Sequence, residues 1–317
     1  MATSYTITEK IKNLLATSDK LRAKILLTPV STRVEREIKW FFKVERIKWA
    51  MSFMDSPLSD FEIIKILGNP YPKKPTIVEK QVFALKNVFE YIQETWTASP
   101  KPVELVTIKK IYEIGCKSYL GRMSGLTDFS LKMVYDSLNF LNQGKEHPVI
   151  LAGIAQVEFV NARLLEYGNP VVARLLSYLM LYKNGYDIHG MYSLDEYHKK
   201  DLQVYDSLLD TVSNLPNITA WLEYYAQGVV ENLENSLQKI NDESLITKRT
   251  KTILKLNHRQ KELLSALEKP GTKVTNKDYQ KMFGVSQITA SRDLSRLTNL
   301  GFLLTQGKGR SVFYTKV

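Results

Sequence analysis

The 317-residue sequence predicts a mainly α-helical protein that ends in a small unit of three helices and a β-hairpin. Apolar side chains recur every three to four residues through most of the chain, which is the period of a helix buried on one face. Several helix starts are marked by a serine or threonine that is followed three residues later by an acidic residue. Only residues 302–314 contain two short apolar runs around a glycine-rich turn, which is the pattern of a hairpin.

Residues 1–100 form the expected N-terminal helical region. Ser59 with Glu62, and Thr76 with Glu79, have the spacing of capping boxes. In a capping box each of the two side chains satisfies a backbone N–H that the first helical turn leaves without a partner. Each pair therefore predicts the start of a helix.

Residues 101–240 form the expected core, and its centre is the stretch 147–186. Apolar residues at helical spacing run before and after the tight turn Tyr167–Pro170. His147 is expected to start the first helix. Pro170 suits the first position of the second helix, where its missing N–H would have no partner. A Gly-Asn turn that leads into a helix N-terminus can hold an anion.

Further helices are expected on both sides of this centre. The segment before it is split at Gly121–Gly125. After it we expect helices at 193–211 and 217–242. The first of these is opened by a third capping box, Ser193 with Glu196.

The central stretch resembles the active-site region of the Fic family, the nucleotidyl transferases that move AMP from ATP onto a protein hydroxyl. The family motif is His-x-Phe-x-(Asp/Glu)-Gly-Asn-Gly-Arg-x-x-Arg. With Gly168-Asn169 aligned, Arg163 stands at the histidine and Tyr167 at the acidic residue. Pro170 and Val171 replace the second glycine and the first arginine, whereas Gly168, Asn169 and Arg174 match. Three later segments also resemble the helices that follow the motif in the family, at 172–186, 195–209 and 218–229.

These substitutions predict that the chemistry of the family is lost. The histidine implied by the resemblance is a general base, and the guanidinium of Arg163 cannot accept a proton. The acidic residue binds Mg²⁺, for which the neutral phenol of Tyr167 is a poor ligand. We therefore expect no catalytic residue, no metal and no cofactor, and a nucleotide-binding remnant made of Gly168, Asn169 and Arg174. The alternative is a protein nucleotidyl transferase with a non-standard site, which would use ATP and Mg²⁺.

Two regulatory features implied by the resemblance are also altered. In many Fic proteins an N-terminal helix carries a glutamate that pairs with the last arginine of the motif and holds the enzyme off. That glutamate aligns with Met54, whose thioether cannot pair with Arg174, although the neighbouring Asp55 leaves a shifted pairing open. A β-hairpin flap that clamps the target has little room between Leu120 and Thr127. The absence of the general base, of the inhibitory glutamate and of room for the flap together predicts a pseudoenzyme.

One cysteine and four histidines restrict the chemistry of the chain. Cys116 lies in an apolar helical stretch without a histidine or acid partner, which predicts a buried thiol in a reducing compartment. The scattered histidines argue against a zinc site. No N-terminal segment has the form of a signal peptide, and no run approaches about 18 apolar residues. We therefore expect a cytoplasmic protein without a membrane partner.

The positive charge of the chain is concentrated at its C-terminal end. The chain has 44 lysines and arginines and 33 acidic residues, which gives a net charge of +11. Residues 247–317 hold 15 of the basic and 4 of the acidic residues, so 29 of each sign remain elsewhere. A neutral body with a basic end predicts a polyanionic partner for that end alone.

Residues 241–256 are polar and then basic, and they form the expected linker to a last domain at 257–317. Its expected elements are, in order, a helix at 258–269, a short helix capped by Thr275 and Asp278, a helix at 287–299 that Ser286 caps after the turn at Gly284, and a hairpin made by 302–304 and 312–314. This order resembles bacterial winged helix-turn-helix DNA-binding domains, which Fic proteins often carry at this end.

The outward face of the helix at 287–299 is polar, whereas its small Ala290 allows close crossing with another helix. The residues expected to reach base edges are Gln287, Thr289, Ser291, Arg292 and Ser295. Those expected at phosphates or in the minor groove are Arg296, Lys308 and Arg310.

Double-stranded DNA is therefore the predicted partner of residues 257–317, and the predicted function is transcriptional or autoregulatory. A homodimer and a nucleotide or protein effector are further candidate partners. The competing interpretations are the transferase and a scaffold whose last domain binds protein.

Overall fold

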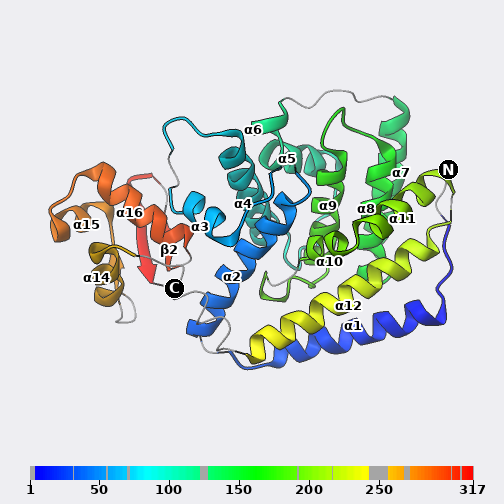
Figure 1. Cartoon of the computed structure of the whole chain (residues 1–317), viewed down its shortest axis with the longest axis horizontal. Coiled ribbons are helices and arrows are strands. Elements are labelled where there is room, and N and C mark those ends of the chain that lie inside the picture. The colour runs from blue at the N-terminus through cyan, green and yellow to red at the C-terminus, as the bar shows by residue number, and fades with distance from the viewer. Residues whose placement is uncertain are drawn as a thin grey trace.

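The structure is a computed structural model that describes residues 4–30, 32–54, 56–69, 72–121, 128–190, 193–215, 217–242, 256–267, 272–300, 302–307 and 309–316. It is mainly helical, as predicted. A large helical body is joined to a small C-terminal unit of three helices and a sheet, which lies at one end of the molecule (Figure 1). Lys308, residues 122–127 and most of the expected linker lie outside the described residues.

The centre of the body is the predicted helix pair, α8 (Pro148–Ala162) and α9 (Asn169–Lys183). Both helices are buried on nearly all sides, because they pack on each other and are surrounded by other helices. His147 caps α8 as expected, and its ring Nδ1 accepts a hydrogen bond of 3.2 Å from the backbone N–H of Val149. Pro170 is the second residue of α9 rather than the first, since the helix already begins at Asn169.

The other helices of the body pack around this pair (Figure 1). Those in contact with α8 or α9 are α4 (Ile77–Trp96), α5 (Leu105–Gly115), α7 (Asp128–Gln143), α11 (Leu202–Asn214) and α12 (Thr219–Asn241). The outer elements are α1 (Glu9–Leu27), which lies along α12, together with α2 (Thr32–Met51), α3 (Asp60–Leu67), α6 (Lys117–Leu120), η1 (Ile188–Gly190) and α10 (Asp195–Lys200). One hydrophobic cluster contains Ile11, Leu85 and Leu233, so the regions before and after residue 100 share a core.

Two of the predicted capping boxes are confirmed at α3 and α4. The side chains of Ser59 and Thr76 accept hydrogen bonds from the backbone N–H groups of Glu62 and Glu79, and both glutamates bond back to the cap. Cys116 is buried as predicted, and burial raises the pKa of its thiol to about 11.

The third capping box, at Ser193, is wrong. Helix α10 begins after Leu194, and no side chain caps it. The backbone of Ser193 is instead held by Asn232 of α12, which donates to the Ser193 carbonyl at 2.9 Å. The helix predicted at 193–211 is also two helices, because the side chain of Asp201 accepts from the N–H of Val204 and caps a new helix, α11.

The C-terminal unit contains α14 (His258–Ala266), α15 (Asn276–Phe283) and α16 (Gln287–Asn299). The bounds of α16 are those predicted, and Ser286 and Thr275 cap α16 and α15 as expected. The predicted hairpin, β2 (Leu303–Gln306) and β3 (Phe313–Lys316), is present, with η2 (Gly309–Ser311) in its turn. A further strand, β1 (Lys273–Val274), pairs antiparallel with β3 and makes the sheet three-stranded. Two residues are too few to show a strand period in the sequence.

A single carboxylate fixes α16 within this unit. Asp293 accepts hydrogen bonds of 2.8 to 3.1 Å from the side chains of Asn257, Arg259, Gln260 and Tyr279, which come from the start of α14 and from α15. The unit has its own hydrophobic cluster, although Leu300 and Phe302 pack on the core of the body. No described helix has both the length and the apolar character needed to cross a bilayer.

Candidate functional site

The loop between α8 and α9 carries the motif that resembles the Fic active site. Arg163 ends α8 in the left-handed conformation (φ 44°), and Gly168 precedes α9 at φ 85°. The Asn169 side chain closes the loop, because its Oδ1 accepts from the N–H of Leu165 at 2.9 Å and its Nδ2 donates to the Leu165 carbonyl. A donor and an acceptor of this amide are therefore used to hold the loop.

The two residues that the alignment with the Fic motif places at its histidine and its acidic residue are both exposed. Arg163 is exposed, and Tyr167 is 61% exposed. Gly168 lies against α6, so that a methyl group in its place would come within 2.8 Å of the Leu120 Cδ1. The loop thus has a fixed shape, and its exposed side chains include the guanidinium of Arg163, the carboxylate of Glu166 and the phenol of Tyr167.

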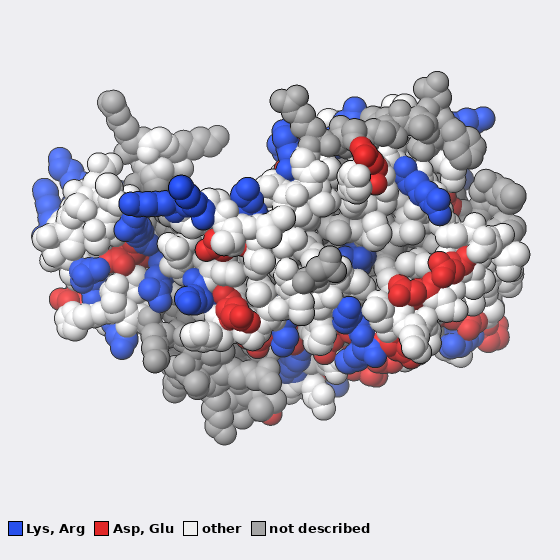
Figure 2. All heavy atoms as spheres, turned by 45° about the horizontal axis from the view of Figure 1, so that its top comes forward, with Lys and Arg blue, Asp and Glu red and all other residues white. Residues whose placement is uncertain are grey.

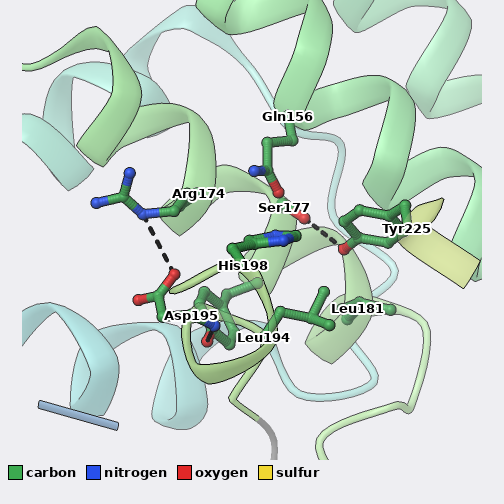
Figure 3. A pocket seen from close by; sticks show the side chains of 9 residues that line it. Gln156, Arg174, Ser177, Leu181, Leu194, Asp195, His198 and Tyr225 are labelled. Atoms are coloured by element: carbon green, nitrogen blue, oxygen red, sulfur yellow. Dashed lines mark hydrogen bonds and ion pairs between the residues drawn. The ribbon is translucent and has the colours of Figure 1, made fainter. Parts of the chain in front are cut away.

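Arg174, the last residue of the motif, is buried inside the body (Figure 3). Its Nε lies 3.2 Å from Oδ1 of Asp195, and the two side chains are only 6% and 3% exposed. The ring of Phe53 covers the guanidinium, at 4.1 Å from its carbon. Phe53 precedes Met54, so the segment aligned with the inhibitory helix does reach Arg174, through a ring. Asp55 lies outside the described residues.

Arg174 and Asp195 belong to a compact polar pocket that is too tight to admit a water molecule. The other residues that line it are Gln156, Ser177, Tyr178, Leu181, Leu194, His198 and Tyr225 (Figure 3). Gly168 and Asn169 do not line this pocket. The three matching residues of the motif therefore contribute to two separate local structures, the loop and the buried pair.

His198 was not predicted as part of any site, and it is completely buried beside Arg174. Its Nδ1 lies 3.2 Å from the hydroxyl of Tyr224, whose ring stacks on the imidazole. Burial, with a smaller contribution from the charge of Arg174, lowers the pKa of His198 to about 3. Burial also raises the pKa of Asp195, and the charge of Arg174 opposes that shift. The histidine is therefore neutral near pH 7.

The first half of α16 is open to solvent on its outer face. Gln287, Ile288 and Arg292 are exposed, and Ile288 is 67% exposed although it is apolar. Sequence reasoning missed Ile288, and an apolar residue on the polar face was its only signal. Thr289 and Ser291 are half-buried, and the Ser291 hydroxyl accepts from Asn276 Nδ2 at 2.8 Å.

The second half of α16 faces the body instead. Ser295 lines a groove between α16 and α4. Arg296 lies near the end of α3, since a methyl group at Gly68 would be 3.5 Å from its Nε. Asn299 Nδ2 approaches the Leu67 carbonyl at 3.5 Å. Arg310 lies in η2, and Lys308 is outside the described residues.

Figure 2 shows how the charges are distributed over one face of the molecule. Lysines and arginines gather over the C-terminal unit, at the left of the view, whereas both signs alternate over the body. The open half of α16 therefore belongs to the basic end of the molecule.

No family model and no curated protein matches the chain. Solved structures do match it. A Fic family protein from Desulfovibrio desulfuricans G20 aligns with 100% of this chain and 98% of its own, at a TM-score of 0.62 and 15% identity. The chain has the Fic fold. A segment of Fic-1 from C. elegans aligns over 73% of both chains (TM-score 0.60, 16% identity). A Fic domain containing signaling protein from Bacteroides thetaiotaomicron VPI-5482 covers 74% of this chain and 98% of its own (TM-score 0.57, 15% identity).

The Fic fold explains why α8, the loop and α9 lie at the centre of the body, but the position aligned with the Mg²⁺-binding acid of the motif holds Tyr167. Hard cations need oxygen ligands, usually carboxylates. In the loop, the exposed carboxylate belongs to Glu166, one position before the residue aligned with the acid of the motif, and the described residues contain no group of three or more histidine, cysteine, aspartate or glutamate side chains that could hold a metal. Arg174 is occupied by Asp195.

Proposed function

We propose that this Fic-fold protein is a DNA-binding regulator whose core no longer transfers nucleotides. The observation that carries the proposal is the exposed outer face of α16, with Gln287, Ile288 and Arg292 on a helix that Asp293 holds in place. Together with the local excess of positive charge, these side chains are of the kinds that a helix uses to contact base edges in the major groove.

The proposal assigns a role to each element of the C-terminal unit. Helices α15 and α16 with the turn at Gly284 form the helix-turn-helix, and β2, η2 and β3 form the wing. Arginine pairs well with guanine, glutamine with adenine, and an apolar side chain packs on the methyl group of thymine. Arg292, Gln287 and Ile288 supply one residue of each kind. A symmetric dimer would place two such helices on the two halves of an operator.

The loss of transferase activity is supported by three features of the Fic core. Arg163 cannot accept a proton, Tyr167 is a poor Mg²⁺ ligand, and Arg174 is held by an internal carboxylate. A base alone contributes roughly 10²–10⁴ in rate, so its loss would leave little activity even if a nucleotide were bound.

The test is selection of bound fragments from random and native DNA by the full-length protein at near-physiological salt. Arg292→Ala and Arg310→Ala are run beside it, with Lys110→Ala of the body as a control of equal charge. We expect an enriched sequence, and a loss of affinity of about 10- to 100-fold for Arg292→Ala, because a bidentate base contact contributes about 1–3 kcal/mol.

Two results would contradict the proposal. Binding without sequence preference that collapses as salt rises would show only a charged surface. Transfer of labelled AMP from ATP to a protein, abolished by Arg163→Ala, would favour the alternative of a transferase with a non-standard site.

A further inference from the structure

A groove of about 470 Å³ lies between the body and the C-terminal unit. Its lining comes from α4, α16, β2 and β3, and consists of Phe83, Lys86, Asn87, Ser295, Thr298, Asn299, Thr305 and Tyr314. The volume is that of a site for a small molecule, and such sites occur preferentially where domains meet. A DNA duplex, whose major groove alone is about 12 Å wide, is far too large for it.

The chemistry of the lining is selective. It combines two amides, four hydroxyl groups and two aromatic rings with one ammonium group and no carboxylate. The ammonium belongs to Lys86, which lies 2.6 Å from Glu90, and Glu90 is also 2.9 Å from Lys43. These three side chains together keep one positive charge in excess. Amides and hydroxyls bond to ligand hydroxyls in both directions, and an ammonium at the wall attracts an anion.

We infer that this groove binds a phosphorylated sugar, either free or as part of a nucleoside monophosphate. The ring hydroxyls of the sugar meet the amides of Asn87 and Asn299 and the hydroxyls of α16 and β2, and the phosphate lies toward Lys86. The aromatic rings of Phe83 and Tyr314 give apolar surface to a sugar face or a base. This site is distinct from the α8–α9 loop, with which it shares no residue.

Occupation of the groove has a consequence for DNA, which rests on the proposed function. A ligand that touches both α4 and the Ser295–Asn299 half of α16 bridges the body and the C-terminal unit. It therefore stabilises the contact between the body and the C-terminal unit, where Asn299 Nδ2 approaches the Leu67 carbonyl. It also covers Ser295. In this arrangement Ser295 faces the groove and not the solvent, so a ligand that stabilises the arrangement opposes any contact of Ser295 with DNA. The ligand and DNA therefore compete. Coupling between two sites is reciprocal, so DNA must also weaken binding of the ligand.

The experiment is calorimetry on the full-length protein with four probes: ribose 5-phosphate, glucose 6-phosphate, AMP and inorganic phosphate. We expect saturable binding of at least one of the three sugar phosphates and much weaker binding of phosphate alone. Lys86→Met should lower the affinity about 10- to 100-fold, because it removes a charge-assisted hydrogen bond. Thr305→Trp should abolish binding by filling the groove, whereas Lys110→Met on α5 should change nothing. Ribose 5-phosphate and AMP distinguish a free sugar phosphate from a nucleotide.

Two results would overturn the inference. The first is no saturable binding of any sugar phosphate. The second is binding that both Lys86→Met and Thr305→Trp leave intact, since the ligand would then lie elsewhere. Thermal unfolding of each variant checks that it is folded. Titration of DNA with and without the ligand is a separate readout, in which we expect DNA affinity to fall by about 5- to 150-fold. If calorimetry shows ligand binding but the protein has no affinity for DNA, the ligand site is supported and the proposed function is rejected.

Discussion

Arg174 and Arg292 are each the sixth residue of their helix, α9 and α16. Arg174 is buried, lies 3.2 Å from Asp195 and is covered by the ring of Phe53. Arg292 is exposed on a helix that buries only one face, and it forms no hydrogen bond or ion pair with another described residue. The same side chain is thus a part of the core in one helix and a solvent-exposed cation in the other.

The difference shows that a residue's place in a motif does not fix its surroundings. An arginine that is buried beside a carboxylate is less accessible to an external phosphate than one that is exposed. In the Fic core, Asp195 meets the charge of Arg174, whereas α16 leaves Arg292 available. Five single variants separate these two regions.

The largest effect is expected from Asp195→Ala. This change leaves the guanidinium of Arg174 buried without its counter-ion, which typically costs about 3–5 kcal/mol of folding free energy. Urea denaturation measures the loss. The double variant Arg174→Met with Asp195→Leu is the control, because an apolar pair removes both charges and should recover most of the stability. A single variant as stable as the wild type would show that Arg174 is not enclosed.

The pH dependence of stability tests the polar pocket through His198. Its pKa is lowered from 6.5 to about 3, so the unfolded chain binds a proton below pH 6.5 while the folded chain does not. The stabilisation is therefore fully present above pH 6.5 and falls by about 1.4 kcal/mol for each pH unit below it. His198→Phe should reduce this slope between pH 6 and 4.5. Equal slopes for the two proteins would mean that the histidine is solvated.

Alanine substitution of one glycine in each region compares the α8–α9 loop with the C-terminal unit. Gly168 and Gly284 both have positive φ angles, 85° and 61°, so alanine is strained at either position. A methyl group would meet Leu120 at Gly168 but nothing at Gly284. We expect losses of about 1–3 kcal/mol for Gly168→Ala and about 1 kcal/mol for Gly284→Ala. The reverse order in thermal unfolding would show that the loop adapts to the methyl group.

The smallest effect on folding is expected from Arg292→Ala. An exposed side chain without internal partners should change the free energy of unfolding by no more than about 0.5 kcal/mol. Its effect should appear only with DNA, where the loss of one base contact would lower the affinity for the selected sequence about 10- to 100-fold and relax the specificity at one position. A variant that is clearly destabilised would place Arg292 in the structure of the unit rather than at its surface.

Much of the fold follows from local signals in the sequence. Periodicity and caps gave the α8–α9 pair and the bounds of α16, because these features depend on residues within one or two helical turns. The same reasoning failed at Ser193, where Oδ1 of Asn232 on α12 accepts from the backbone N–H that Glu196 would have bonded in a capping box. It also missed β1, which exists only because β3 lies beside it.

The candidate sites were less predictable than the fold, since each depends on distant residues. Arg174 could be named from the motif, but its partner Asp195 and its cover Phe53 come from other elements, 21 and 121 positions away. The groove requires α4 and α16, more than 200 positions apart. No pattern within one segment of the sequence indicates that two such distant helices line the same groove. Exposure was also misjudged, because periodicity could not show that Ser295 faces the body while Arg292 faces solvent.

The burial of the lone cysteine gives the chain a practical property. The thiol of Cys116 is shielded by the core and its pKa is raised to about 11, so maleimide dyes react with it slowly at neutral pH. Cysteines introduced at the exposed positions Lys80 of α4 and Lys277 of α15 would therefore take up dyes selectively without removal of the native one. Neither position lines the groove, so energy transfer between the two dyes would follow the separation of α4 and α15 in single molecules as ligands or DNA are added.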